Sequence, residues 1–267
     1  MNTNCGGINI SGIGIRKLGL FAEASLPRDM GKALLIPTKR GTELAWRFNN
    51  ENLSEEKQKE LFGDIYSLCK KSFCVQKGAE FSEDVKNHIY DAHEFCIVPF
   101  GDVPNGLAPS CFGTDRIAAF ASYSFLNYWK NKEFIYFSGI VVDPSLHGLG
   151  YGSLLIKEIM ETYGIRVAVL RTQSPVMYCS FAKVCDVHPS FLGKKTSGEI
   201  KNIASYVAIN ILNMSRYDAK EMIEEGTYGE SLYGEEPTIN DVGLDHLFKQ
   251  KININRGDSI IVVGIKK

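Results

Sequence analysis

The chain has 267 residues, of which 44% are hydrophobic, so it can bury a large core as one enlarged domain or as a domain with an appendage. Its 30 basic and 31 acidic residues give a formal charge of −1, which disfavours nucleic acid and an anionic membrane surface as partners. The first residues show no charged segment followed by an apolar run, and no stretch approaches the roughly 20 apolar residues that span a bilayer. We therefore expect a cytoplasmic protein.

The seven cysteines are scattered along the chain and form no Cys-x-x-Cys pair, and no histidine accompanies them at the spacing of metal ligands. Most of them are expected to be reduced thiols in the core. His88 and His93 lie five residues apart, which places them on different faces of a helix. The sequence therefore predicts no metal site, and we expect both histidines to be ordinary residues.

The first part of the chain predicts a strand and two helices. Residues 1–42 are rich in glycine and show little periodicity, so they are expected to be an N-terminal extension. A strand is predicted over 43–48. Two helices follow, the first capped by Ser54 and the second by Ser82, before another strand at 95–98.

The middle of the chain carries the clearest periodic patterns, after a loop rich in proline and glycine at 104–109. Two strands are predicted there, joined by a polar turn near Asn131. A helix that stops at Gly164 comes next, because glycine commonly follows the last helical residue. The elements predicted besides that helix are, in chain order, strands at 116–126, 133–142 and 167–170 and a short helix at 175–184.

The most informative segment joins the strand at 133–142 to the helix that follows it. Pro144 and the glycines Gly148, Gly150 and Gly152 form a turn between the two. Glycines let the backbone approach a ligand and adopt positive φ angles, and the first-turn amides of a helix lack intrahelical acceptors. These donors and the helix dipole favour an anion such as pyrophosphate. The glycine spacing fits neither a P-loop nor a dinucleotide fingerprint.

This segment resembles the acyl-CoA loop of the GNAT N-acyltransferases, whose pattern runs Val-x-Pro-x-x-Arg-Gly-x-Gly-x-Gly/Ala. The matching positions are Val142, Pro144, Gly148, Gly150 and Gly152. His147 departs from the pattern, since the family has arginine or glutamine there. The order of predicted elements over 43–185 also resembles the family. The resemblance implies an α/β (α+β) GNAT fold, with a mixed central sheet splayed at its fourth and fifth strands and helical additions on the N- and C-terminal sides.

Within that fold we expect a GNAT core at 43–190, followed at 191–267 by a helical insertion and the closing strand of the same domain. Residues 200–214 and 219–225 are predicted to be helical, and 259–265 to form the closing strand. The insertion is expected to wall the acceptor side of the cleft. Its acidic residues would favour a cationic acceptor if they face the cleft, and a solvated acidic loop is the alternative: Glu224, Glu225, Glu230, Glu235 and Glu236.

The resemblance further implies acetyl-CoA as co-substrate and no metal. The pantetheine arm would bind the backbone of Ile140, Val141 and Val142. The pyrophosphate would bind the loop amides of His147, Gly148, Leu149, Gly150, Tyr151, Gly152 and Ser153. Histidine carries less positive charge than arginine at pH 7, so backbone donors are expected to supply most of the affinity. His147 is expected either to neighbour the phosphates or to face solvent.

Acyl transfer requires a neutral amine, a donor to the oxyanion and a proton for the departing thiolate. The resemblance implies the backbone N–H of Val142 as the oxyanion donor. Phe181 occupies the position where the family has a tyrosine acid, so Tyr178, one helical turn away, is the candidate acid, with a buried aromatic of satisfied hydroxyl as the alternative. Glu133 is the candidate base, and an exposed charge at the strand end is the alternative.

We therefore expect an acyl-CoA-dependent N-acyltransferase that transfers an acetyl group from acetyl-CoA to a primary amine of a small molecule or protein. The alternative is a catalytically weak GNAT-fold module that binds acyl-CoA or a protein partner without turnover. Acylation of charged tRNA is disfavoured by the missing basic patch. The expected partners are acyl-CoA and an amine acceptor, without nucleic acid or membrane, and the chain is expected to be a monomer or homodimer.

Overall fold

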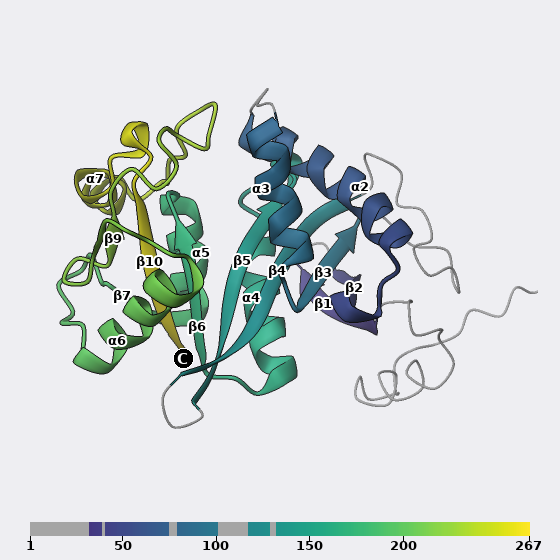
Figure 1. Cartoon of the computed structure of the whole chain (residues 1–267), viewed down its shortest axis with the longest axis horizontal. Coiled ribbons are helices and arrows are strands. Elements are labelled where there is room, and N and C mark those ends of the chain that lie inside the picture. Colours follow the sequence, from purple (N-terminus) through teal and green to yellow (C-terminus); the bar gives the residue numbers. More distant parts are fainter. Residues whose placement is uncertain (1–31, 39–40, 75–78, 101–116, 129–131) are drawn as a thin grey trace, which may run out of the picture.

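The computed structural model describes residues 32–38, 41–74, 79–100, 117–128 and 132–267. The strands of this part form one mixed sheet in the order β1-β2-β3-β4-β5-β6-β10-β9-β8, with β7 also paired to β10 (Figure 1). The strands are β1 (Lys32–Thr38), β2 (Gly41–Asn49), β3 (Glu94–Pro99), β4 (Ile117–Tyr128), β5 (Lys132–Val142), β6 (Val167–Thr172), β7 (Cys185–His188), β8 (Tyr217–Asp218), β9 (Ile223–Glu224) and β10 (Ser259–Lys266). Among the described strand pairs, β5 and β6 alone run parallel.

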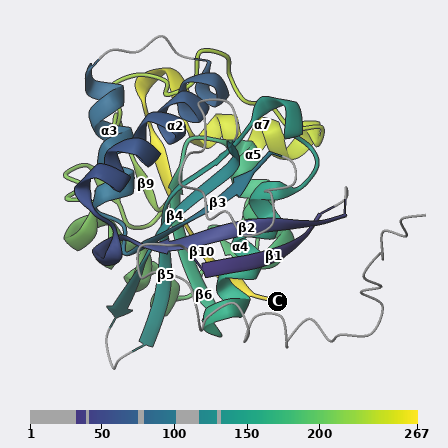
Figure 2. The same cartoon turned by 90° about the vertical axis from the view of Figure 1, so that its right-hand side faces the viewer.

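Helices cover both faces of this sheet (Figures 1 and 2). The α-helices are α2 (Glu55–Phe73), α3 (Ala79–Tyr90), α4 (Tyr151–Tyr163), α5 (Pro175–Val184), α6 (Gly198–Tyr206) and α7 (Val242–Lys251). A π-helical turn, Val207–Ile211, extends α6. Among the described residues, no helix combines the length and the apolar character needed to cross a membrane.

Alternating side chains of the strands divide the core into layers. On β10, Ile260 and Val262 join the cluster that contains the apolar faces of α4, α5 and α7. Ile261 and Val263 face the other way and pack with α6. The helices α2 and α3 cover the same face as α6, further along the sheet, with Phe95 and Phe120 beneath them. The sheet is therefore sandwiched between two helical layers.

Local signals placed several helix ends correctly. The Ser54 hydroxyl accepts a hydrogen bond from the Lys57 amide at 3.2 Å, so it caps α2 as predicted. Helix α4 ends at Gly164, which has a φ of +66°. Helix α5 begins at Pro175 and ends at Val184, the predicted bounds. The closing strand 259–265 is confirmed as β10.

Two predicted helix positions were wrong. Helix α3 begins at Ala79, so Ser82 lies inside it and is not its cap. Residues 219–225 form no helix, because the Asp218 carboxylate accepts the amide of Lys220 at 2.7 Å and holds a turn between β8 and β9. Pairing of Ile223 with β10 then makes this segment the edge of the sheet.

Strand β1 and helix α7 are among the elements that were not predicted. β1 lies within the expected N-terminal extension and forms a hairpin with β2 that brings Thr38 opposite Gly41. The 10-residue helix α7 is capped by Asp241, whose carboxylate accepts the Leu244 amide at 3.0 Å. Its Phe248 is buried against α5 in the core. The loop at 104–109 and the turn at Asn131 lie outside the described residues.

Candidate active site

The sheet opens between its two parallel strands. β5 and β6 are paired only from Ile135 and Ala168 to Phe137 and Leu170. The register of β4 against β5 shifts at this point and leaves Ser138 as an extra residue on β5. A bulge bends and twists a strand, so it separates the rest of β5 from β6. The splay predicted from the family resemblance is therefore present.

The bulge also changes which face each later residue of β5 occupies. Regular alternation would place Ile140 on the face of Phe134 and Tyr136. Instead, Ile140 packs on the α4 side of the sheet. Val141 packs on the opposite side, with α2 and α3. One inserted residue moves every later side chain of a strand to the opposite face of the sheet, and here the change occurs directly beside the opening.

The open edge of β5 presents backbone groups to the gap. The Asp143 amide donates to the Ala118 carbonyl at 2.9 Å, which makes Val142 and its partner on β4 a non-hydrogen-bonded pair. The N–H and C=O of Val142 therefore point away from β4, as do those of Ile140 two residues earlier. The Val142 carbonyl accepts the Ser72 hydroxyl at 2.9 Å. The N–H groups of Ile140 and Val142 face the side of β6.

The loop after β5 has the backbone of an anion cradle. Gly148 and Gly150 have φ angles of +78° and +92°, in the region that favours glycine. Helix α4 begins at the buried Tyr151, with Gly150 at its N-cap and no side-chain cap. The Ser153 hydroxyl donates to the Gly150 carbonyl at 2.8 Å, which holds the turn. The first-turn amides, including that of Gly152, lack intrahelical acceptors and suit phosphate oxygens.

Two amides of the predicted cradle are already used inside the loop. The His147 amide donates to the Pro144 carbonyl at 3.2 Å, and the Leu149 amide to the Leu146 carbonyl at 3.2 Å. The exposed His147 ring lies with Nε2 3.1 Å from the Val142 carbonyl oxygen. Fewer amides than predicted can therefore act as phosphate donors, and the remaining candidates lie at the glycines and at the start of α4.

Asp143 ties the loop to α2. Its Oδ2 lies 2.7 Å from Lys71 Nζ, and its Oδ1 accepts the Ser145 amide at 2.9 Å. Burial by itself raises the pKa of the Asp143 carboxyl, but the hydrogen bonds from Lys71 and Ser145 outweigh it and hold the pKa below its ordinary value. Asp143 therefore remains ionised and caps the turn.

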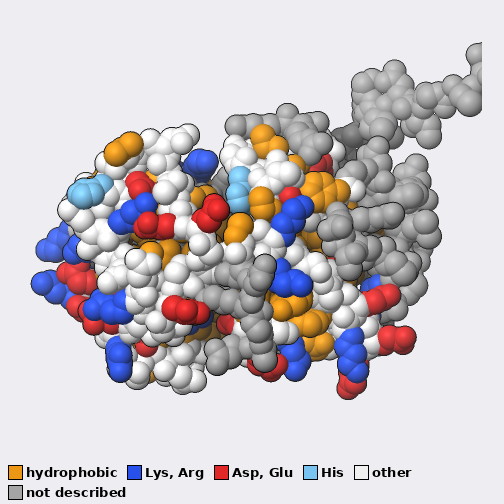
Figure 3. Space-filling model, turned by 90° about the horizontal axis from the view of Figure 1, so that it is seen from above, with side chains coloured by type: hydrophobic (Ala, Val, Ile, Leu, Met, Phe, Trp, Pro, Cys, Tyr) orange, Lys and Arg blue, Asp and Glu red, His pale blue; other side chains and the backbone are white. Residues whose placement is uncertain are grey.

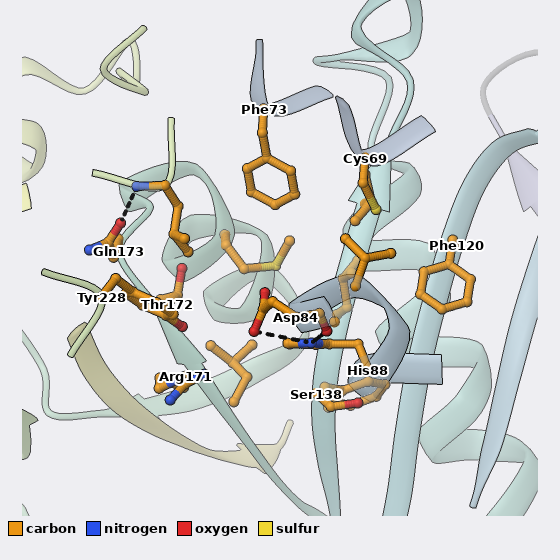
Figure 4. Close-up of a pocket in the computed structure, with 18 of the residues that line it drawn as sticks. Cys69, Phe73, Asp84, His88, Phe120, Ser138, Arg171, Thr172, Gln173 and Tyr228 are labelled. Atoms are coloured by element: carbon orange, nitrogen blue, oxygen red, sulfur yellow. Dashed lines mark hydrogen bonds and ion pairs between the residues drawn. The ribbon is translucent and has the colours of Figure 1, made fainter. Parts of the chain in front are cut away.

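A cavity of about 100 Å³ lies where β5 and β6 separate (Figure 4). An engineered cavity of about 150 Å³ accommodates benzene, so this space suits a compact chemical group. Its walls come from α2, α3, β4, β5, β6, α5 and the segment 228–233. The lining residues are Cys69, Phe73, Phe81, Asp84, Val85, His88, Phe120, Phe137, Ser138, Gly139, Ile140, Val141, Leu170, Arg171, Thr172, Gln173, Met177, Tyr228, Leu232 and Tyr233.

His88 was expected to be an ordinary residue, but it lines this cavity. Its Nδ1 lies 2.7 Å from the Asp84 carbonyl oxygen and 3.7 Å from the Asp84 carboxylate. An Nδ1–H that donates to this carbonyl leaves Nε2 as the acceptor nitrogen, and Nε2 hydrogen-bonds to none of the described residues. The ring packs so closely on β5 that a Cβ at Gly139 would lie 3.2 Å from its Cδ2. The available signal was Asp84 one helical turn before the histidine.

Two polar side chains of β6 and the residue after it also reach the cavity. The guanidinium carbon of Arg171 lies 4.7 Å from the centroid of the Tyr228 ring. The buried Gln173 accepts the Leu232 amide at Oε1, at 3.0 Å, while its Nε2 has no partner within the described chain. Both side chains are therefore positioned by the insertion, and Gln173 retains an unused donor.

Tyr178, the predicted acid, lies outside this lining. Its hydroxyl donates to the Pro189 carbonyl at 2.9 Å, and its ring packs against Phe191 and Phe248. Burial raises the pKa of Tyr178. This is the arrangement of a buried aromatic with a satisfied hydroxyl, so the acid role stays a prediction without support from the geometry.

Glu133, the predicted base, is exposed at the opposite end of β5. It lies six residues before Gly139, which corresponds to about 20 Å along a strand. The geometry therefore does not support Glu133 as the base.

The insertion contributes one wall of the cavity, through Tyr228, Leu232 and Tyr233. The Gly234 amide donates to the Phe73 carbonyl at 2.8 Å and joins this segment to the end of α2. The wall consists of this irregular segment, whereas α6 packs elsewhere on the sheet. The expected helical wall is thus corrected to a loop wall.

The insertion's glutamates do not line the cavity within the described chain. Glu224 is buried and accepts the Thr227 hydroxyl at 3.0 Å. Glu225 pairs with Arg256 at 3.1 Å, and Glu236 with Lys249 at 3.5 Å. The space-filling view in Figure 3 shows acidic and basic side chains interspersed over the described part of the face that it draws. These carboxylates therefore lend no support to a cationic acceptor.

Residues 62–175 match the sequence profile of the Acetyltransferase (GNAT) family. No curated protein matches the chain closely enough in sequence to count as a relative. Solved structures resemble it distantly, among them the PaiA N-acetyltransferase of Thermoplasma acidophilum in complex with coenzyme A, with 14% identity, a TM-score of 0.34 and coverage of 58% of this chain and 93% of that chain. A GNAT-family protein of Desulfovibrio desulfuricans shares 13% identity over 54% and 86% of the two chains, with a TM-score of 0.36.

Proposed function

The chain carries an acetyltransferase domain of the GNAT family, and from this premise we propose that it is an acyl-CoA-dependent N-acyltransferase. It transfers an acetyl group from acetyl-CoA to a primary amine. One observation carries the proposal: the open edge of β5 leads from the glycine loop at the start of α4 directly to the cavity that holds His88.

The residues along this edge suit an acyl-CoA molecule. The glycines and first-turn amides at the start of α4 would hold the pyrophosphate. The outward N–H groups of Ile140 and Val142 would bind the pantetheine arm and the thioester oxygen. The thioester would then lie at the bulge, beside Gly139. A bound acyl-CoA supplies the activated acetyl group, and the protein supplies its position.

His88 is assigned as the base of this reaction. Its Nε2 would take the proton from the attacking amine, while the Asp84 carbonyl keeps the proton on Nδ1 and fixes the ring. The Val142 N–H would donate to the oxygen on which negative charge develops. Nitrogen gains a bond to the acetyl carbon, the carbon–sulfur bond breaks, and the thiolate takes a proton from solvent, to which His88 gives up the proton that it received from the amine.

One observation favours the alternative of an acyl-CoA-binding module without turnover. The Tyr178 hydroxyl is held by the Pro189 carbonyl and does not reach the cavity lining, so this tyrosine offers no proton to a thiolate. If the chain is an enzyme, another group or solvent must supply the proton to the thiolate. The two functions differ in whether coenzyme A is released.

The test is thiol release from acetyl-CoA over a panel of primary amines, paired with calorimetric binding of acetyl-CoA. Turnover with at least one amine supports the enzyme, whereas tight binding without thiol release with any amine supports the binding module. His88→Gln should lower kcat by roughly 10²- to 10⁴-fold, the usual contribution of a positioned base. His246→Gln, at an exposed histidine of α7, is the matched control and should leave kcat unchanged. Wild-type kcat in His88→Gln would refute the base assignment.

A further inference from the structure

Arg171 lies near the end of β6, and Gln173 directly follows the strand. Both line the cavity, and both are held by the insertion segment (Figure 4). The Tyr228 ring covers the guanidinium, and the Leu232 amide binds the carboxamide oxygen. These contacts fix the positions of the two side chains, and the Gln173 Nε2 remains without a partner in the described chain.

Arg171 is a cation without an acidic partner. No carboxylate of the described chain lies within 4 Å of its guanidinium nitrogens, although the side chain is partly buried. Burial alone lowers the pKa of Arg171, but the Tyr228 and Tyr136 hydroxyls and the more distant Asp84 carboxylate outweigh it and raise the pKa. The side chain therefore stays charged. A buried charge is costly when unpaired, and an anionic ligand group would remove that cost.

Gln173 supplies a second, independent sign of a ligand. Only 1% of its surface is exposed, and its Nε2 has no hydrogen-bond partner in the described chain. Leaving a buried donor unsatisfied costs about 1–3 kcal/mol, so a water, an ion or a bound molecule that accepts from it would be stabilising. A planar guanidinium and a neighbouring N–H donor together match the two oxygens of a carboxylate.

The opposite wall of the cavity carries His88 and Asp84, on α3 (Figure 4). Apolar rings of Phe73, Phe81 and Tyr233 line the space besides these polar groups. An acceptor that satisfies every wall has an amine for His88, an anionic group for the β6 side and an apolar part for the aromatic rings. Its anionic group needs two acceptor oxygens and little volume.

We propose that the acceptor is a small primary amine that carries a carboxylate, an α-amino acid with an apolar side chain, whose carboxylate binds Arg171 and Gln173 and whose amine faces His88. This assignment rests on the proposed acetyl transfer and specifies its substrate class. The apolar rings would hold the amino-acid side chain.

The experiment compares matched amines that differ only in the carboxylate: phenylalanine with phenethylamine, and leucine with 3-methylbutylamine. Each is assayed by thiol release from acetyl-CoA. A hydrogen bond to a charged group contributes roughly 1.5–3 kcal/mol, so kcat/KM should favour the amino acid by about 10- to 150-fold. Arg171→Gln should abolish this preference, chiefly by raising KM, and leave the affinity for acetyl-CoA unchanged. Gln173→Leu should reduce the preference, and it provides a second test if the Arg171 variant fails to fold.

Arg166→Gln, at an exposed arginine directly before β6, is the matched control and should retain the full preference. Equal or faster turnover of the decarboxylated amines would overturn the assignment and leave the acyltransferase function intact. A preference that survives both Arg171→Gln and Gln173→Leu would also overturn it. Thiol release with none of the amines, measured together with acetyl-CoA binding, would overturn the proposed function itself. Calorimetric binding of N-acetylphenylalanine, weakened in Arg171→Gln, provides a readout independent of turnover.

Discussion

Gly150→Val tests whether the loop before α4 holds the acyl donor. Gly150 has a φ of +92° and forms the N-cap of α4. A β-branched residue at this angle is strained, so the loop must shift to relieve it. The shift moves the amides of the first helical turn, which are the groups assigned to the pyrophosphate.

Gly150→Val should affect both the stability of the fold and the affinity for acetyl-CoA. Strain at a left-handed position costs roughly 1–3 kcal/mol and appears in the free energy of unfolding. Loss of two charge-assisted hydrogen bonds to phosphate costs roughly 3–6 kcal/mol at about 1.5–3 kcal/mol each, and appears in ligand affinity. Because 1.4 kcal/mol corresponds to tenfold, acetyl-CoA should bind at least about 100-fold more weakly. The added Cβ would lie 3.7 Å from the Ser153 hydroxyl, an ordinary contact, so a steric clash in the fold is not the cause.

The measurement is calorimetric titration with acetyl-CoA, together with thermal unfolding. Gly164→Val is the matched control, since Gly164 ends the same helix with a φ of +66° and open space around its Cβ position. Both variants should lose comparable stability, but only Gly150→Val should lose affinity. Wild-type affinity in Gly150→Val, or an equal loss in Gly164→Val, would refute the assignment of the loop.

Two further predictions concern other buried groups. Tyr178→Phe removes the hydrogen bond to Pro189 and should lower Tm by roughly 2–4 °C while kcat stays unchanged; a 10²-fold fall in kcat would instead establish Tyr178 as the acid. Burial and the neighbouring Glu60 raise the pKa of Asp64 from 3.8 to about 6, so its stabilising contribution is present below pH 4 and is lost as the pH rises through 6. Asp64→Asn should therefore raise Tm at pH 7.5 but not at pH 4, and an equal effect at both pH values would contradict this reasoning.

Local chemistry explains which features were predicted from the sequence. Ser54, Gly164 and Pro175 mark helix ends through groups within one turn of each end, so their effect does not depend on distant parts of the chain. The glycine loop is equally local, because Gly148 and Gly150 adopt positive φ angles within one turn. The same reasoning failed at 219–225, where pairing of Ile223 with β10 overrides helical propensity.

The candidate chemistry depends on contacts between distant segments. Ser138 forms a bulge only because β5 pairs with β4 and leaves this residue without a partner. The bulge separates β5 from β6 and changes which face of the sheet each later side chain of β5 occupies. His88 and Arg171 are separated by 83 residues in the sequence, yet both line one cavity, and Tyr228 reaches it from the insertion. The sequence alone therefore determined the glycine turn between β5 and α4 and most of the elements from β2 to α5. Only tertiary packing decided which polar side chains share the cavity, because no local pattern records which residues meet across a splayed sheet.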